Sequence, residues 1–176
     1  KNCIAVGMSQ GFIEPLEASA LAMVELSLNM LSEQMPHDRV HMQLLATRFN
    51  QRFSYRWQRV IDFLKLHYIL SERDDSQYWL DIKSPASIPA RLTELLALWQ
   101  YQQPSRFDLI ENEEIFPSAS YQYVLYGMGF HSQAATAENA FYNPKAGHYF
   151  YQQNRAKIAQ CLQALPTNRT LLNQLL

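Results

Sequence analysis

Two glutamates flank a proline in the stretch GFIEPLEASAL, residues 11–21, immediately before an apolar run typical of a helix. A helix start needs one capping or acidic residue, because a carboxylate near the amino-terminal dipole contributes only about 0.3–1 kcal/mol. Glu14 can meet that need, and Pro15 fixes the approach of the chain. A second carboxylate, Glu17, is then redundant for capping and suited to general acid or base chemistry. We interpret Glu17 as a candidate catalytic residue, with a structural cap as the alternative.

The backbone N–H groups of Ser19 and Ala20 fall in the first turn of the same predicted helix. Such groups have no partner within a helix, so they can bind an anion. Because the carboxylate of Glu17 would repel that anion, the motif must keep the two apart.

Two groups of basic residues have simpler explanations. One is a row of arginines at helical spacing, Arg48, Arg52, Arg56 and Arg59, which could bind nucleic acid or form a solvated helix face. With a net charge of −1, we favour the solvated face and expect no nucleic-acid partner. The other is the pair His37 and His41, four residues apart, for which no third metal ligand is evident, so we expect no metal site.

Aromatic side chains gather around a glycine turn near residue 128, at Tyr121, Tyr123, Tyr126 and Phe130. Aromatic residues at this density pack a core, or they form the floor of a pocket for a flat ligand that the glycines allow to approach. The sequence leaves both interpretations open.

The elements that position these residues are mainly helical, since the chain is poor in glycine and rich in Leu, Gln and Ala. CIAVG, residues 3–7, predicts one short buried strand, and no partner strand follows it. We therefore expect the chain to be the last strand of a larger sheet followed by a helical half. The first helix is predicted over residues 18–34, ending before Pro36.

A long helix should then begin after Asp38, a plausible N-cap. Apolar residues recur along it at spacings of three and four, at Phe49, Phe53, Trp57, Val60, Leu64 and Tyr68. Residues 78–89 read as a linker, and residues 104–118 as irregular chain with a short strand pair. Further helices are predicted over residues 90–102, 120–128 and 144–165, with a short one after Pro166.

Composition limits what kind of protein this is. The 176 residues are 48% hydrophobic, which suits a compact domain, and contain no apolar run long enough to span a membrane or to act as a signal peptide. Cys3 and Cys161 are too few for a zinc site or a disulfide framework. We therefore expect a cytoplasmic protein without a membrane partner.

Three stretches together resemble the flavin-dependent tryptophan halogenase family. They are NCIAVGMSQGFIEPLEASAL (residues 2–21), DFLKLHYILSERDDSQYW (62–79) and YVLYGMGF (123–130), and they occur in the order that the family has. The resemblance implies the carboxy-terminal, helical part of a larger α/β enzyme with a monooxygenase-like FAD-binding domain. Residues 1–17 would be the last strand and loop of that domain, and residues 18–176 the helical domain on the substrate side.

The resemblance also implies roles for individual residues. Glu17 faces the substrate ring, and the N–H groups of Ser19 and Ala20 hold chloride or bromide. Met8 and Leu21 contact FAD, and Tyr121 and Gln122 lie where relatives bind the substrate. In such enzymes reduced FAD and oxygen convert halide to hypohalous acid, which halogenates an electron-rich aromatic ring such as that of indole or tryptophan.

The resemblance covers only part of such an enzyme. The glycine-rich phosphate motif, the catalytic lysine and the Trp-x-Trp-x-Ile-Pro motif of the family are not in this sequence, so we expect these 176 residues to be inactive alone. The expected partners are the amino-terminal FAD-binding part of the same protein, a separate flavin reductase and a small aromatic substrate; a homodimer is an option. A related flavin hydroxylase and a non-catalytic helical interaction module are the alternatives.

Overall fold

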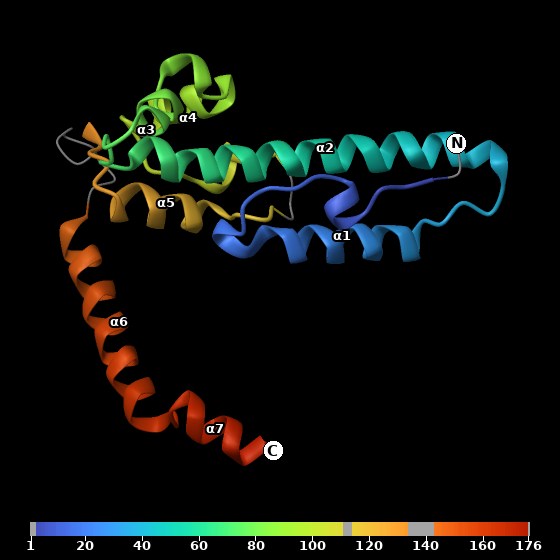
Figure 1. Cartoon of the computed structure of the whole chain (residues 1–176). Helices are drawn as coiled ribbons and strands as arrows, with labels where there is room; N and C mark the ends of the chain where they lie inside the picture. The colour runs from blue at the N-terminus through green and yellow to red at the C-terminus, as the bar shows by residue number, and fades with distance from the viewer. Residues whose placement is uncertain (1–2, 111–113, 134–142, 176) are drawn as a thin grey trace. The chain divides into compact units, whose positions relative to one another are not determined.

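The computed structural model describes residues 3–110, 114–133 and 143–175, and every regular element in these ranges is a helix. The mainly helical fold that the sequence predicted is confirmed. Contacts divide the chain into two units, Lys1–Ala134 and Ala135–Leu176. Figure 1 shows the elements of both.

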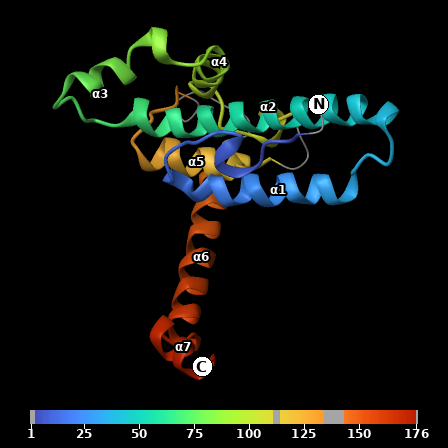
Figure 2. The same cartoon turned by 45° about the vertical axis from the view of Figure 1, so that its right-hand side comes forward.

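Two long helices form the frame of the first unit. α1 (Ser19–Glu33) and α2 (Arg39–Leu70) run side by side in opposite directions, as both views show (Figures 1 and 2). Asp38 caps α2 as predicted, since its side chain accepts a hydrogen bond from the backbone N–H of His41 at 2.9 Å. The antiparallel arrangement brings the start of α1 next to the end of α2.

The predicted apolar stripe of α2 builds two core clusters. Phe49 and Phe53 pack with Met23 of α1. Further along α2, Val60, Phe63, Leu64 and Leu66 form a second cluster with α4 (Ala90–Trp99), α5 (Ser118–Gly127) and the residue Phe116 that precedes α5. The residues from the two helices are Leu92, Leu95, Trp99, Tyr121 and Leu125. These two helices hold the second half of α2 in place.

The linker predicted over residues 78–89 is wrong, because the structure has α3 (Gln77–Ile82) and the 3₁₀ helix η3 (Pro85–Ser87) there. The ring of Trp79 lies 5.8 Å from that of Tyr68, and the guanidinium of Arg73 lies over it at 4.5 Å. The ammonium of Lys65 donates to the carbonyl of Ile82 at 2.5 Å. The contacts with Tyr68 and Lys65 of α2, together with Arg73 just after that helix, order a segment whose two prolines suggested a linker.

The described ranges contain no strand. The strand predicted at residues 3–7 is therefore absent, and so is a strand pair in the described part of residues 104–118. Val6 is extended, with φ −137° and ψ 146°, and the 3₁₀ helix η1 (Gly7–Ser9) follows it. η4 (Arg106–Asp108) is the regular element in the later segment. A strand needs a hydrogen-bonded partner, and the described residues supply none to residues 3–7.

The arginine row is half buried, which corrects the prediction of a solvated face. Arg48 and Arg52 are exposed, but Arg56 and Arg59 are each 6% exposed. Arg56 lies over the ring of Phe53, with its guanidinium 5.1 Å from the ring centroid. The spacing of apolar residues alone could not show that the later arginines of the row, Arg56 and Arg59, are buried.

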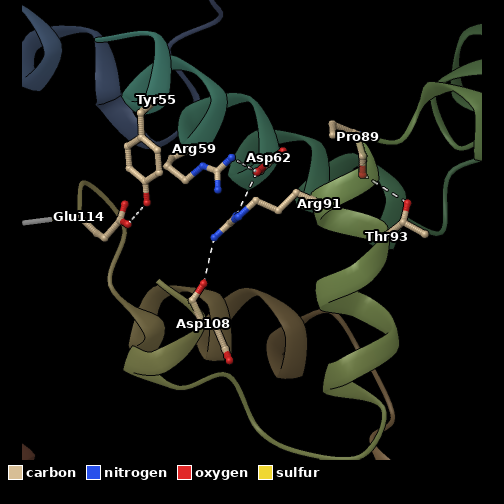
Figure 3. Close-up of polar contacts among 8 residues, drawn as sticks. All are labelled: Tyr55, Arg59, Asp62, Pro89, Arg91, Thr93, Asp108 and Glu114. Atoms are coloured by element: carbon tan, nitrogen blue, oxygen red, sulfur yellow. Dashed lines mark hydrogen bonds and ion pairs between the residues drawn. The ribbon is translucent and has the colours of Figure 1, made fainter. Parts of the chain in front are cut away.

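Figure 3 shows the ionic cluster that Arg59 joins. Its guanidinium lies 3.2 Å from the carboxylate of Asp62, and the guanidinium of Arg91 on α4 lies 3.1 Å from the same carboxylate. Arg91 also donates to the carbonyl of Asp108 at 3.1 Å. Asp62 therefore links α2 to α4, and burial raises its carboxyl pKa against the opposite pull of the two arginines.

The second unit consists of α6 (Pro144–Ala164) and α7 (Asn168–Leu175), close to the predicted ranges. The side chain of Asn143 caps α6 by accepting from the N–H of Ala146 at 3.0 Å, and the helix ends before Pro166. Across the described part of the chain, none of the helices combines the length and apolarity needed to cross a membrane.

Candidate active site

The backbone turns sharply at the second glutamate of the E-P-L-E motif. The 3₁₀ helix η2 (Leu16–Ala18) leads into α1, and within it Glu17 has φ 63° and Ala18 has φ 52°. Two consecutive non-glycine residues in the left-handed region cost about 1–2 kcal/mol each. Backbone strain of this kind is concentrated at functional sites and requires support from the surroundings.

The last turn of α2 supplies that support to both glutamates of the motif. The hydroxyl of Tyr68 donates to the carboxylate of Glu14 at 2.5 Å, and Nε2 of His67 lies 3.1 Å from Oε1 of Glu17. The hydrogen bond to Glu14, with burial, raises the pKa of Tyr68 to about 12. The end of one helix thus fixes the side chains at the start of another.

His67 is itself fixed to the core. Its Nδ1 lies 2.8 Å from the carbonyl oxygen of Phe63, one turn earlier in α2, and the two rings meet edge to face at 5.0 Å. The His67 side chain is 16% exposed, whereas that of Glu17 is 41% exposed. The carboxylate of Glu17 is therefore accessible to a ligand while its histidine partner is largely covered.

His67 and Tyr68 were missed as site residues. Both belong to the LHY sequence within residues 62–79, a stretch that indicates the family but by itself predicts no role for either residue. The sequence signal that could have found them is this adjacent His-Tyr pair in the last turn of the predicted long helix.

The start of α1 has no side-chain cap. Ala18 is its N-cap residue and supplies no hydrogen-bond acceptor, so the first N–H groups, including those of Ser19 and Ala20, have no capping side chain. Ser19 is buried, and its hydroxyl has no hydrogen-bond partner among the described residues, whereas Ala20 is exposed. This end of the helix retains the positive potential that favours an anion.

Met8 in η1 and Leu21 in the first turn of α1 have uncovered apolar side chains, 82% and 79% exposed. The loop that carries Met8 is packed on α2 at Gly11, where an added Cβ would lie 3.0 Å from the indole ring of Trp57. Glycine therefore suits residue 11, because any larger side chain would press on the indole ring of Trp57.

Tyr121 and Gln122 lie on α5, and none of the contacts described for either residue reaches Glu17. Tyr121 is 1% exposed and packs on Phe63 at 4.9 Å and Trp99 at 5.4 Å. Burial raises the pKa of its phenol to about 12. Gln122 donates through Nε2 to the carbonyl of Pro104 at 2.6 Å.

The aromatic cluster around the glycine turn therefore divides into two parts. Tyr121 belongs to the core, whereas Tyr123 is 81% and Tyr126 46% exposed. Tyr121 and His67 both pack on the ring of Phe63. This part of α5 therefore supports the same turn of α2 that holds Glu17.

Comparison with known proteins gives one consistent family. The family described as tryptophan halogenase matches residues 1–143. The tryptophan 6-halogenase SttH of Streptomyces toxytricini is 30% identical over 166 residues, which is 94% of this chain and 31% of that protein. A tryptophan halogenase of Shewanella frigidimarina has a similar structure, with a TM-score of 0.88 and 44% identity over 98% of this chain and 33% of its own.

A further similar structure is BrvH, described as a flavin-dependent halogenase from Brevundimonas, with a TM-score of 0.76 and 29% identity; the match covers 99% of this chain and 35% of BrvH. The chain thus spans about a third of the length of the relatives that it matches.

Proposed function

The chain belongs to the tryptophan halogenase family, and on that basis we propose that it forms the helical, substrate-side part of a flavin-dependent halogenase. The whole enzyme would halogenate an electron-rich aromatic ring, of the indole or tryptophan kind, with oxygen and chloride or bromide. The observation that carries the proposal is the exposed carboxylate of Glu17, held in a strained turn directly before an uncapped helix.

Glu17 would act on the ring that is being halogenated. Attack by an electrophilic halogen leaves a positive charge on the ring and a proton to be removed from the attacked carbon. A carboxylate at a fixed position stabilises the first and accepts the second. The imidazole of His67 on the far side of this carboxylate keeps it in one orientation.

The start of α1 would bind the halide through the N–H groups of Ser19 and Ala20. Pairing with His67 reduces the repulsion between the carboxylate of Glu17 and the halide. This repulsion is the reason why the motif must keep the carboxylate and the anion apart. Ala18 suits this role because a side-chain cap would compete for the same N–H groups.

FAD fits the exposed apolar residues of η1 and of the start of α1. Met8 and Leu21 offer largely exposed apolar side chains that a flat ring system can cover. When bound, reduced FAD supplies the reducing equivalents with which oxygen and halide give hypohalous acid. We assign residues 1–17 to the edge of the FAD-binding domain and residues 18–176 to the helical domain, and we propose that a separate flavin reductase delivers the reduced cofactor.

Tyr121 and Gln122 belong to the substrate side of the proposal. Tyr121 would shape the site from the core, through its packing on Phe63, and Gln122 would hold α5 to the chain at Pro104. Residues 118–130 contain no charged side chain, which suits an indole-like ring better than the ammonium and carboxylate of a free amino acid.

The test uses the full-length protein with reduced FAD, oxygen, bromide and indole, and identifies the product by mass spectrometry. Monobrominated indole that forms only with bromide supports the proposal. A hydroxylated product that forms without bromide would indicate the related hydroxylase instead. Failure to consume reduced flavin at all would favour a non-catalytic interaction module.

A further inference from the structure

The imidazole of His67 lies between two oxygen atoms. Its Nδ1 is 2.8 Å from the carbonyl oxygen of Phe63, and its Nε2 is 3.1 Å from Oε1 of Glu17. Both distances are within the normal range for a hydrogen bond from nitrogen to oxygen. The question is how many protons these two contacts need.

A backbone carbonyl can only accept, so Nδ1 of His67 must carry a proton. A neutral imidazole has a single N–H, which leaves Nε2 as an acceptor facing Glu17. An ionised carboxylate is also only an acceptor, and two acceptors repel each other. The contact between His67 and Glu17 is therefore a hydrogen bond only while the pair holds a second proton, on Nε2 or on the carboxyl group.

We propose that His67 is the positioning residue of Glu17, which it holds through this second proton, and that halogenation therefore weakens when rising pH removes the proton. This inference rests on the proposed function and adds the residue that orients the carboxylate. Glu17 is the group that acts on substrate, and His67 acts through it.

The surroundings of His67 suit such a role. Phe63 is 1% exposed and packs on Phe116 at 4.0 Å and on Tyr121 at 4.9 Å, so the carbonyl that anchors Nδ1 belongs to a rigid core. His67 also lies in the last turn of α2, where the helix dipole favours a positive charge. The strained backbone at Glu17 needs an external contact of this kind to keep one conformation.

Other titratable groups on the packed elements must be separated from this pair. They are Glu14 before η2, Tyr68 on α2, Tyr78 on α3 and Tyr121 on α5. Glu14 accepts from Tyr68, and the pKa values of Tyr68 and Tyr121 are raised to about 12, so these two phenols keep their protons below pH 10. Tyr78 interacts with Tyr68, and among the described hydrogen bonds none joins these four groups to His67 or Glu17.

Two substitutions in the full-length enzyme divide the contacts of His67 between them. His67→Gln places an amide N–H near the position of Nε2, so it can donate to Glu17 at every pH. His67→Asn places one near Nδ1, so it can keep the anchor to Phe63 but cannot reach Glu17. Tyr68→Phe is the control for the neighbouring Glu14 pair.

Bromination of indole is measured with each variant from about pH 6 to about pH 9. We expect the kcat of wild type to fall as pH rises. The kcat of His67→Gln should stay within about threefold of wild type near pH 6 and should not fall at higher pH. His67→Asn should lose about 10- to 100-fold in kcat at an unchanged KM. Tyr68→Phe should keep the wild-type pH profile. Two results would overturn the inference. One is a His67→Asn enzyme as active as wild type, and the other is a His67→Gln enzyme whose activity falls with pH as that of wild type does.

Crystal structures of the full-length protein at the two ends of that pH range give a readout that does not need activity. The contact between His67 and Glu17 should be present at low pH and broken at high pH in wild type, and present at both in His67→Gln. A wild-type contact that persists at both would contradict the inference. If wild type makes no brominated product, the proposed function fails, while these structures still decide whether His67 positions Glu17.

Discussion

Glu17 combines a strained backbone with an exposed, paired carboxylate, so a substitution that changes only its charge separates chemistry from structure. In the full-length enzyme, Glu17→Gln keeps the size of the side chain and should leave FAD binding and oxidation of reduced flavin unchanged. Halogenation should fall by about 10²- to 10⁴-fold, the range for a positioned acid or base. Product formation and flavin oxidation are measured in parallel.

The matched control is Glu25→Gln, since Glu25 is an exposed glutamate on α1, the helix that follows Glu17. It should halogenate like wild type. If Glu17→Gln stays within about threefold of wild type, Glu17 is a structural cap and not the catalytic residue.

Tyr121 presents a different case, because its buried hydroxyl makes no hydrogen bond of normal geometry among the described residues, although Arg91 acts on it to lower the pKa against the larger effect of burial. An unsatisfied buried polar group costs about 1–3 kcal/mol, so Tyr121→Phe should keep or raise the free energy of unfolding. Burial raises the pKa of the phenol to about 12 in the folded state, from its ordinary value of 10.0, so the phenol destabilises the fold as pH rises above 10. The gain from Tyr121→Phe should therefore be larger at alkaline pH.

Urea unfolding of wild type and Tyr121→Phe near neutral pH and near pH 11 measures this difference. A loss of more than about 1 kcal/mol at neutral pH would mean that the hydroxyl makes a stabilising hydrogen bond. A raised KM for indole with unchanged stability would instead mean that the hydroxyl touches the substrate.

Among the elements, α2 has the most varied contacts, and its middle is joined to α4 through a buried carboxylate. Asp62 is 3% exposed and lies between Arg59 and Arg91 (Figure 3). Asp62→Ala leaves two guanidinium groups without this partner, which costs about 3–5 kcal/mol when an ion pair is buried. We expect a lower temperature of unfolding for full-length Asp62→Ala.

The control is Asp75→Ala, which breaks the pair with Arg73 at the surface, where both side chains are 59% exposed. Solvent screens an exposed pair of this kind, so this variant should unfold close to wild type. Equal effects of the two substitutions would mean that the buried cluster does not join α2 to α4.

The helices were predictable because their signals are local. The spacing of apolar residues predicted α2 and α4. Asp38 predicted where α2 begins, and Pro166 predicted where α6 ends. α3 was missed because its stability comes from Trp79 packing on α2, which composition does not reveal. The buried half of the arginine row was missed for the same reason, since a partner such as Asp62 and the helix that covers it are known only after folding.

The candidate site was predictable only in part. Glu17 and the anion-binding helix start stood out because both lie in one short motif. The left-handed backbone and the partners His67 and Tyr68 did not, since they depend on which helix ends meet in space.

At the scale of the whole molecule, the first unit exposes large apolar side chains near the site, among them Met8, Phe12 and Leu21. Apolar surface of this kind marks a region that another part of a protein covers. The relatives are about three times as long as this chain. These 176 residues expressed alone should therefore associate or pack loosely and should not bind FAD, whereas the full-length protein should.

Gel filtration with FAD, followed by the absorbance of bound flavin, tests this for both proteins. Co-elution of one FAD with a monomer of the 176 residues, together with a cooperative thermal transition, would contradict the prediction. Removal of residues 1–17 from the full-length protein should also weaken FAD binding if they belong to the FAD-binding domain.

The two hydrogen bonds that hold the E-P-L-E turn have a consequence for the order of folding. They join residues 54 and 50 positions apart in the sequence, Glu14 with Tyr68 and Glu17 with His67. A contact this distant forms only after the intervening chain has been ordered, and a left-handed turn of non-glycine residues has no local tendency to form earlier. A newly made molecule should therefore assemble its helical core first and the E-P-L-E turn last.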